Sequence, residues 1–182
     1  MQSVRGKLVL LVMLATLAGC ASFSSRPVGN RNVPQPPKSV DLDRYLGRWF
    51  ELYRYEAPFQ KDCEAVVADY SMNPDGSIRV LNSCRKVSVD GRATSATGKA
   101  RVVDPATNAK LKVTFFWPFY GDYWVLDHDD NYQWSIVGEP SGRYLWVLSR
   151  SAHPADDVRQ MLRQRVASLG YDWSIVRQTR HP

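Results

Sequence analysis

The alternation of strand-like segments with turn signals between residues 40 and 150 constrains this fold more than any other feature. Six clusters rich in Pro, Gly, Asn and Asp supply the dihedral angles that turns require. The segments between them are rich in Val, Ile, Thr and aromatic residues, which favour strands. The pattern predicts strands at residues 48–55, 64–72, 77–88, 93–103, 109–117, 122–128, 131–138 and 143–149.

Eight strands in meander order, joined by short connections, either stack as two sheets or close into a barrel. The turns lie about 10 to 16 residues apart, which exceeds the roughly 8–12 residues typical of sandwiches. Closure also removes the edge strands that invite aggregation. We therefore predict an all-β, eight-stranded antiparallel up-and-down barrel with an interior wide enough for one small ligand.

One helix is expected after the barrel. Pro154 lies near its start, and the acidic residues Asp156 and Asp157 lie in its first turn, where the helix dipole favours them. Gly170 is a candidate for the cap at its end, and a short strand is expected at residues 173–176. Apolar residues at helical spacing predict that the helix packs on the outside of the barrel: Val158, Met161, Leu162, Val166 and Leu169.

Residues 1–19 have the form of a secretory signal peptide. Two basic residues precede an apolar run of 11 residues at 8–18, which is short of the roughly 20 residues needed to span a bilayer. The ending at Leu17–Cys20 resembles the lipobox of bacterial lipoproteins. That resemblance implies cleavage after Gly19, a palmitate-type lipid anchor on Cys20 and, because Ala21 follows, the outer membrane facing the periplasm. An ordinary signal peptide with a chance Cys is the alternative.

The remaining chain divides into a linker, one domain and a short tail. Residues 20–38 contain the candidate acylated Cys and four Pro, and they predict a semi-extended linker. The domain is expected at residues 39–178 and the tail at 179–182. The net charge of +6 falls to +4 once the two basic residues of the signal are removed. No basic run of five residues is left, so nucleic-acid binding is disfavoured.

Three motifs in order resemble those of the lipocalin family. They are the Gly47-Arg48-Trp49 segment, residues 127–132 at a turn, and residues 144–150, which end the eighth strand with Arg150. Residues 116–123 are most similar to bacterial outer-membrane lipoprotein lipocalins and their apolipoprotein-D-like relatives. The resemblance covers residues 39–178 and implies a barrel that binds fatty acids or lysophospholipids, without a cofactor and without enzymatic activity.

The motif residues have a structural role in the expected barrel. Trp49 places a large, flat apolar side chain at the start of the first strand, and Gly47 lets the backbone approach it closely. The guanidinium of Arg150, at the end of the last strand, can stack on the Trp49 indole as a cation–π pair. We therefore expect Gly47, Trp49 and Arg150 to close one end of the barrel.

Strand alternation suggests which aromatic residues line the interior. Tyr144, Trp146 and Leu148 share the parity of Arg150, whereas Tyr53 shares that of Trp49 and Glu51. The alternative is that the aromatic residues only fill a core. We expect a lipid headgroup at the mouth, near Lys61, Arg92 or Arg143. The predicted ligand-binding residues are Trp146, Tyr144, Tyr123, Phe115 and Trp117.

Cys63 and Cys84 flank the expected hairpin turn at residues 73–76 almost symmetrically. They should therefore lie on adjacent strands, and an oxidising periplasm favours a disulfide between them. The alternative is a free Cys63 thiol that serves as the nucleophile of a barrel enzyme.

No other catalytic or metal-binding pattern is present. The three His are far apart in the sequence, so no metal site is predicted. The acids at 127, 129 and 130 lack the spacing of a calcium loop, and phosphate-loop, dinucleotide and G-x-S-x-G motifs are absent. Three functions therefore stand in this order: a membrane-anchored lipid-binding lipocalin, a barrel enzyme with Cys63 or a carboxylate as its base, and a structural envelope lipoprotein without a ligand. Each of them is compatible with a homodimer.

Overall fold

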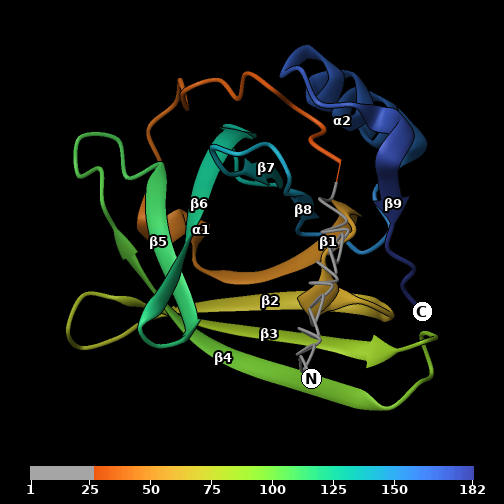
Figure 1. The fold of residues 1–182 in the computed structure, drawn as a ribbon, viewed down its shortest axis with the longest axis horizontal. Helices are drawn as coiled ribbons and strands as arrows, with labels where there is room; N and C mark the ends of the chain where they lie inside the picture. The colour runs from red at the N-terminus through yellow and green to blue at the C-terminus, as the bar shows by residue number, and fades with distance from the viewer. Residues whose placement is uncertain (1–26) are drawn as a thin grey trace, which may run out of the picture.

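The computed structural model describes residues 27–182, so the predicted signal peptide and Cys20 lie outside the described residues. Eight strands form an antiparallel sheet in the order β2-β3-β4-β5-β6-β7-β8-β1, and a β1–β2 pairing closes it. The predicted eight-stranded barrel is thereby confirmed (Figure 1). The strands are β1 (Gly47–Tyr55), β2 (Cys63–Met72), β3 (Ile78–Lys86), β4 (Ala93–Val102), β5 (Lys110–Phe116), β6 (Phe119–His128), β7 (Trp134–Gly138) and β8 (Leu145–Ser149).

The strands β7 and β8 begin two or three residues later than the sequence predicts. In both cases an acidic side chain occupies the backbone donors that a longer strand would offer to its neighbour. The Asp129 carboxylate accepts from the N–H groups of Asn131 and Gln133. The Glu139 carboxylate accepts from the N–H groups of Ser141, Arg143 and Tyr144.

The β1–β2 seam is completed by the C-terminal segment. The two strands pair only over Gly47–Phe50 of β1, and β9 (Val176–Gln178) pairs with the second half of β1. Beyond β9, the Thr179 N–H donates to the Leu52 carbonyl, and the Ala65 N–H donates to the Arg180 carbonyl. The end of the chain therefore bridges β1 and β2 where their own ladder stops.

The predicted final strand begins later than expected. Residues Trp173–Ile175 form the 3-10 helix η2, because the Asp172 side chain accepts from the Ser174 N–H and starts a turn there. A second 3-10 turn, η1 (Pro58–Gln60), follows β1.

The helix α2 (Asp156–Ser168) packs on the outer face of the barrel, as its apolar stripe predicts. Leu162 and Val166 are fully buried against Ile136 and Val147. Gly170 follows the helix in a left-handed conformation, with φ of 87°, which a side chain would strain. The N–H groups after the helix end donate back to its last turn, so the C-terminal cap falls at the predicted place.

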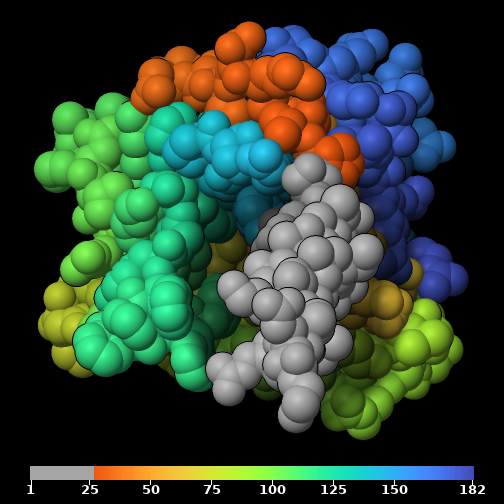
Figure 2. Space-filling view, in the orientation of Figure 1, coloured from red at the N-terminus to blue at the C-terminus, as the bar shows by residue number. Residues whose placement is uncertain are grey.

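Residues 27–39 pack along the domain instead of extending away from it. Gly29 and Asn30 are buried, and both donate N–H bonds to the Gly142 carbonyl. The Asn30 side chain donates to the Leu169 carbonyl at 2.8 Å. Figure 2 shows this segment, in orange, lying beside the blue C-terminal part of the chain. The described part of the predicted linker is thus ordered against the barrel, because a polar backbone here finds specific partners.

The short helix α1 (Leu42–Tyr45) has no counterpart in the sequence prediction and covers one end of the barrel. The Asp41 side chain caps it by accepting from the Arg44 N–H. A second core cluster forms beneath it, around Trp49, Val125 and Leu148. Within residues 27–182, no helix has the length and apolar character needed to cross a membrane.

Candidate functional site

The barrel encloses a cavity of about 820 Å³ that is open at one end. This volume lies in the range of roughly 300–1,000 Å³ that small-molecule sites occupy. Its wall is built mainly from the inward-facing apolar side chains of five strands. Those side chains include Val66, Ala68, Ile78, Val80, Ala100, Leu111, Val113 and Leu148.

Trp49 and Arg150 close the opposite end of the cavity. The Arg150 guanidinium lies 3.7 Å from the centroid of the fully buried Trp49 indole. The same guanidinium donates to the Arg48 carbonyl at 2.6 Å, the Arg44 carbonyl at 2.8 Å and the Leu46 carbonyl at 2.9 Å. It therefore ties α1 and the start of β1 to the end of β8.

Gly47 lies directly under this guanidinium. Its φ is +89°, and a Cβ there would stand 3.5 Å from the Arg150 Nη1 atom. The backbone conformation, more than the available space, requires glycine at this position.

A chain of four hydroxyl groups lies on the cavity floor, next to the closed end. The Tyr45 hydroxyl is 2.9 Å from those of Tyr123 and Ser135, and the Tyr70 hydroxyl is 3.1 Å from that of Tyr123. The three tyrosines line the cavity, whereas Ser135 is fully buried behind them. Burial raises the pKa of Tyr45 to about 12 and raises the pKa values of Tyr70 and Tyr123, so all three phenols stay protonated at neutral pH.

An aromatic stack runs along the wall toward the mouth. Phe59 stacks on Tyr144 with ring centroids 5.8 Å apart, and Tyr144 stacks on Trp146 at 5.6 Å. The Trp146 indole N–H donates to the Gln60 side chain at 3.0 Å. Four of the five predicted ligand-binding residues therefore lie on the cavity wall: Trp146, Tyr144, Tyr123 and Phe115.

Trp117, the fifth predicted residue, is not on the cavity wall. It is 77% exposed, because β5 ends at Phe116 and Trp117 falls in the turn before β6, where strand alternation no longer applies. Tyr53 also differs from the parity prediction. A bulge between Glu51 and Tyr53 shifts the register of β1 against β8, and Tyr53 packs on Trp173 with ring centroids 5.0 Å apart.

The mouth is rimmed by exposed aromatic residues of η1 and the β5–β6 hairpin. Phe59 is 68% exposed, Phe116 77% and Phe119 72%, and all three border the cavity. The sequence suggests Lys61, Arg92 and Arg143 as headgroup partners, but none of the three is on the lining. Lys86, on β3, is the one cation on the lining among the described residues.

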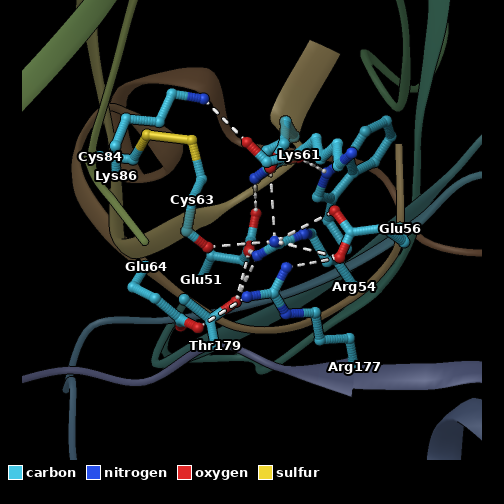
Figure 3. The surroundings of a disulfide bond; sticks show 12 residues. Glu51, Arg54, Glu56, Lys61, Cys63, Glu64, Cys84, Lys86, Arg177 and Thr179 are labelled. Carbon is cyan, nitrogen blue, oxygen red and sulfur yellow. Dashed lines mark hydrogen bonds and ion pairs between the residues drawn. A yellow bond between two sulfur atoms is a disulfide. The ribbon is translucent and has the colours of Figure 1, made fainter. Parts of the chain in front are cut away.

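A buried ionic cluster seals the β1–β2 seam beside the cavity, as Figure 3 shows. The Arg54 side chain is fully buried and donates to Glu51 at 2.8 Å, to Thr179 at 3.0 Å and to the Cys63 carbonyl at 3.1 Å. Arg54 thus joins β1, β2 and the C-terminal segment at the point where ladder hydrogen bonds are missing. Because each buried charge of this cluster has an oppositely charged or hydrogen-bonding partner, its burial is compatible with a stable barrel wall.

Glu64 is the second buried acid of this cluster. It accepts from Arg177 at 2.6 Å and from the Arg180 backbone N–H at 2.8 Å. Burial by itself raises the pKa of Glu64, but these donors outweigh burial and hold the pKa below its usual value.

Cys63 and Cys84 form a disulfide with a Cα–Cα distance of 5.5 Å (Figure 3). Cys63 pairs in register with Lys86, two residues beyond Cys84, so the bridge runs diagonally between β2 and β3. The oxidised pair leaves no thiol at Cys63. Among residues 27–182, no three His, Cys, Asp or Glu side chains gather in a way that could hold a metal ion.

The sequence reasoning missed several cavity residues. Tyr45 belongs to a four-residue helix that shows no periodicity, and Gln60 lies in a 3-10 turn. Tyr70, on the predicted second strand, could have been found by counting forward in steps of two from Val66 and Ala68, which share its face.

A closed barrel with one plugged end and a mainly apolar cavity open at the other belongs to the class of β-barrel proteins with room for one small ligand. The sequence pattern of the Lipocalin-like domain matches residues 40–181. The chain therefore belongs to the lipocalin family, as the three motifs predict.

The relatives include proteins from bacteria, plants and animals. The chain is 37% identical to Outer membrane lipoprotein Blc of Escherichia coli (strain K12), over 92% of this chain and 94% of that protein. It is 38% identical to Temperature-induced lipocalin-1 of Arabidopsis thaliana, over 78% and 80% of the two chains. Apolipoprotein D of Macaca fascicularis is 32% identical, over 91% and 89%.

The fold is also that of solved structures with low sequence identity. Insecticyanin from the tobacco hornworm superposes with a TM-score of 0.68 at 19% identity, covering 85% of this chain and 87% of that one.

Proposed function

We propose that this protein is a membrane-anchored lipocalin that stores or transports fatty acids or lysophospholipids in the cell envelope. It would be attached through Cys20 to the outer membrane and face the periplasm. The Blc relatives, which carry the words outer membrane lipoprotein in their names, support the location. The lipobox-like ending at Leu17–Cys20 supports the anchor.

The observation that carries the proposal is the apolar cavity of about 820 Å³ with an open mouth. Each methylene that leaves water contributes about 0.8 kcal/mol, so a chain of a dozen methylenes gains about 10 kcal/mol. Lost translational and rotational freedom on association costs about 4–15 kcal/mol, which is of the same size as this gain. A long acyl chain is therefore among the few small ligands with enough apolar surface to bind tightly in such a site.

The exposed aromatic rim supports a membrane source for the ligand. Phe116 and Phe119 border the cavity and are mostly exposed, and Trp117 lies between them. Large aromatic rings at a rim favour the interface between water and lipid. A lipid leaving a membrane would then reach the cavity without crossing water.

Displacement of a fluorescent fatty acid from the purified protein tests the proposal. Trp146→Ala removes a ring from the cavity wall and should weaken binding about thirtyfold, because about 2 kcal/mol of apolar contact is lost. Trp117→Ala is the matched control, since it removes the same side chain from outside the cavity. Unchanged binding in Trp146→Ala, with the fold retained, would refute the assignment of the cavity as the lipid site.

The anchor and the natural ligand need separate measurements. Labelling with a palmitate analogue in a bacterial host should tag the wild type and leave Cys20→Ser untagged. Native mass spectrometry of the acylated protein would report both the bound lipid and a homodimer if one forms.

The enzyme alternative has two forms, with Cys63 or with a carboxylate as the reactive group, and the Cys63–Cys84 disulfide argues against the first. We therefore propose a binding protein without catalytic activity.

A further inference from the structure

The hydroxyl chain on the cavity floor has one more proton than it has hydrogen bonds. Tyr70, Tyr123, Tyr45 and Ser135 carry four O–H groups, and three contacts of 2.9–3.1 Å join them. Each contact uses one proton, whichever oxygen donates. One O–H group of the chain is therefore left without an acceptor among the described residues.

The unused proton belongs on a tyrosine. Ser135 is fully buried, and an unsatisfied donor there would cost about 1–3 kcal/mol. When Ser135 donates to Tyr45, the spare O–H falls on one of the three phenols that line the cavity. Tyr70 and Tyr123 are half-buried, because they face the cavity space, whereas Tyr45 is 5% exposed. The spare donor is thus accessible to a ligand at the bottom of a mainly apolar site.

The surroundings select a neutral acceptor over an anion. The nearest guanidinium, Arg150, is engaged by the backbone carbonyls of residues 44, 46 and 48. Lys86, the cation on the described lining, is six residues from Val80 along β3, which is about 20 Å at 3.3 Å per residue. Val80 is the register partner of Tyr70. A carboxylate at the floor would therefore be buried without a counter-charge, which is strongly unfavourable.

We propose that Tyr70 and Tyr123 form a hydrogen-bonding subsite on the cavity floor for a neutral oxygen acceptor, such as a ketone, ester or hydroxyl oxygen, at the inner end of a lipophilic ligand. This inference rests on the proposed function, because it presupposes that the cavity is a lipid site. It adds a preference within that class of ligand. An oxygenated lipid end would be favoured at the floor, and an ionised headgroup would stay at the mouth.

A pair of probes of equal length tests the subsite. The affinities of 2-dodecanone and n-dodecane are measured by displacement of N-phenyl-1-naphthylamine from the purified protein. Each affinity is first divided by the partition coefficient of the same probe from water into hexadecane. After this correction the wild type should bind the ketone about fivefold more tightly than dodecane, which is the contribution of one additional hydrogen bond. The double variant Tyr70→Phe/Tyr123→Phe should lose this preference and keep its affinity for dodecane, because the spare proton is then confined to Tyr45, which is only 5% exposed. Single variants should lose less, because the remaining phenol still has a spare proton.

Tyr120→Phe is the matched control, since Tyr120 borders the mouth and lies outside the hydroxyl chain. A second readout is the infrared C=O stretch of the bound ketone, which should be lower in the wild type than in the double variant. An unshifted stretch would overturn the subsite, and so would a ketone preference that survives in the double variant. In either case, binding of dodecane by the wild type would leave the proposed function standing. Failure of the wild type to bind either probe would overturn both.

Discussion

The Arg150 side chain is expected to be the most sensitive point of the closed end. Arg150→Met keeps the length and apolar stem of the side chain, but removes the cation over Trp49 and the hydrogen bonds to five backbone carbonyls, those of residues 44, 45, 46, 48 and 132. A partly exposed cation–π pair contributes about 1 kcal/mol. The two shortest bonds, 2.6 and 2.8 Å long, contribute about 1.5 kcal/mol each when the donor is charged. The expected loss is therefore about 4 kcal/mol.

Urea unfolding followed by tryptophan fluorescence measures this loss at constant pH with the disulfide intact. Because small domains are stable by about 5–15 kcal/mol, the variant should still fold. Arg150→Lys, which keeps the charge but not the planar fork, should lose about half as much. Arg79→Met is the control, since Arg79 is exposed on β3 and such changes stay within about 0.5 kcal/mol. If Arg150→Met lost no more than Arg79→Met, the closed end would not depend on this guanidinium.

Two further predictions concern the seam and the disulfide. Replacing both Cys63 and Cys84 by Ser should lower the free energy of unfolding by about 3 kcal/mol, because the disulfide closes a loop with a sequence separation of 21. Two reactive thiols per folded wild-type molecule would contradict the presence of this disulfide. The folded pKa of Glu64 is depressed, so its stabilisation should be complete above the unfolded value of about 4.5 and lost as pH falls through the folded pKa. Urea midpoints from pH 6 to pH 3 should therefore fall less for Glu64→Gln than for the wild type, and parallel profiles would refute the role of this carboxylate.

The barrel was predictable because its signals are local. Each turn carries its own Gly, Asn, Asp or Pro, and the strands between them are short and β-branched. The positions of Trp146 and Leu148 followed from Arg150 by alternation, because β8 has no bulge in its pairing with β7.

The errors arose where alternation stops. The bulge in β1 between Glu51 and Tyr53 turns Tyr53 toward Trp173, and the end of β5 leaves Trp117 in a turn. The bulge in β1 has no Gly or Pro to announce it, whereas Pro118, directly after Trp117, did signal the turn that ends β5. The hydroxyl chain was invisible for a different reason, because Tyr45, Tyr70 and Ser135 come from three elements that only the closed barrel brings together.

The seam of the barrel also sets the order in which the wall can be completed. Leu52 and Ala65 find their hydrogen-bond partners at Thr179 and Arg180, more than 110 positions later in the chain. Contacts this distant in sequence close large loops and form late. A chain that emerges N-terminus first would therefore carry an open slit between β1 and β2 until its last residues arrive. During that interval it would need protection from other unfolded chains.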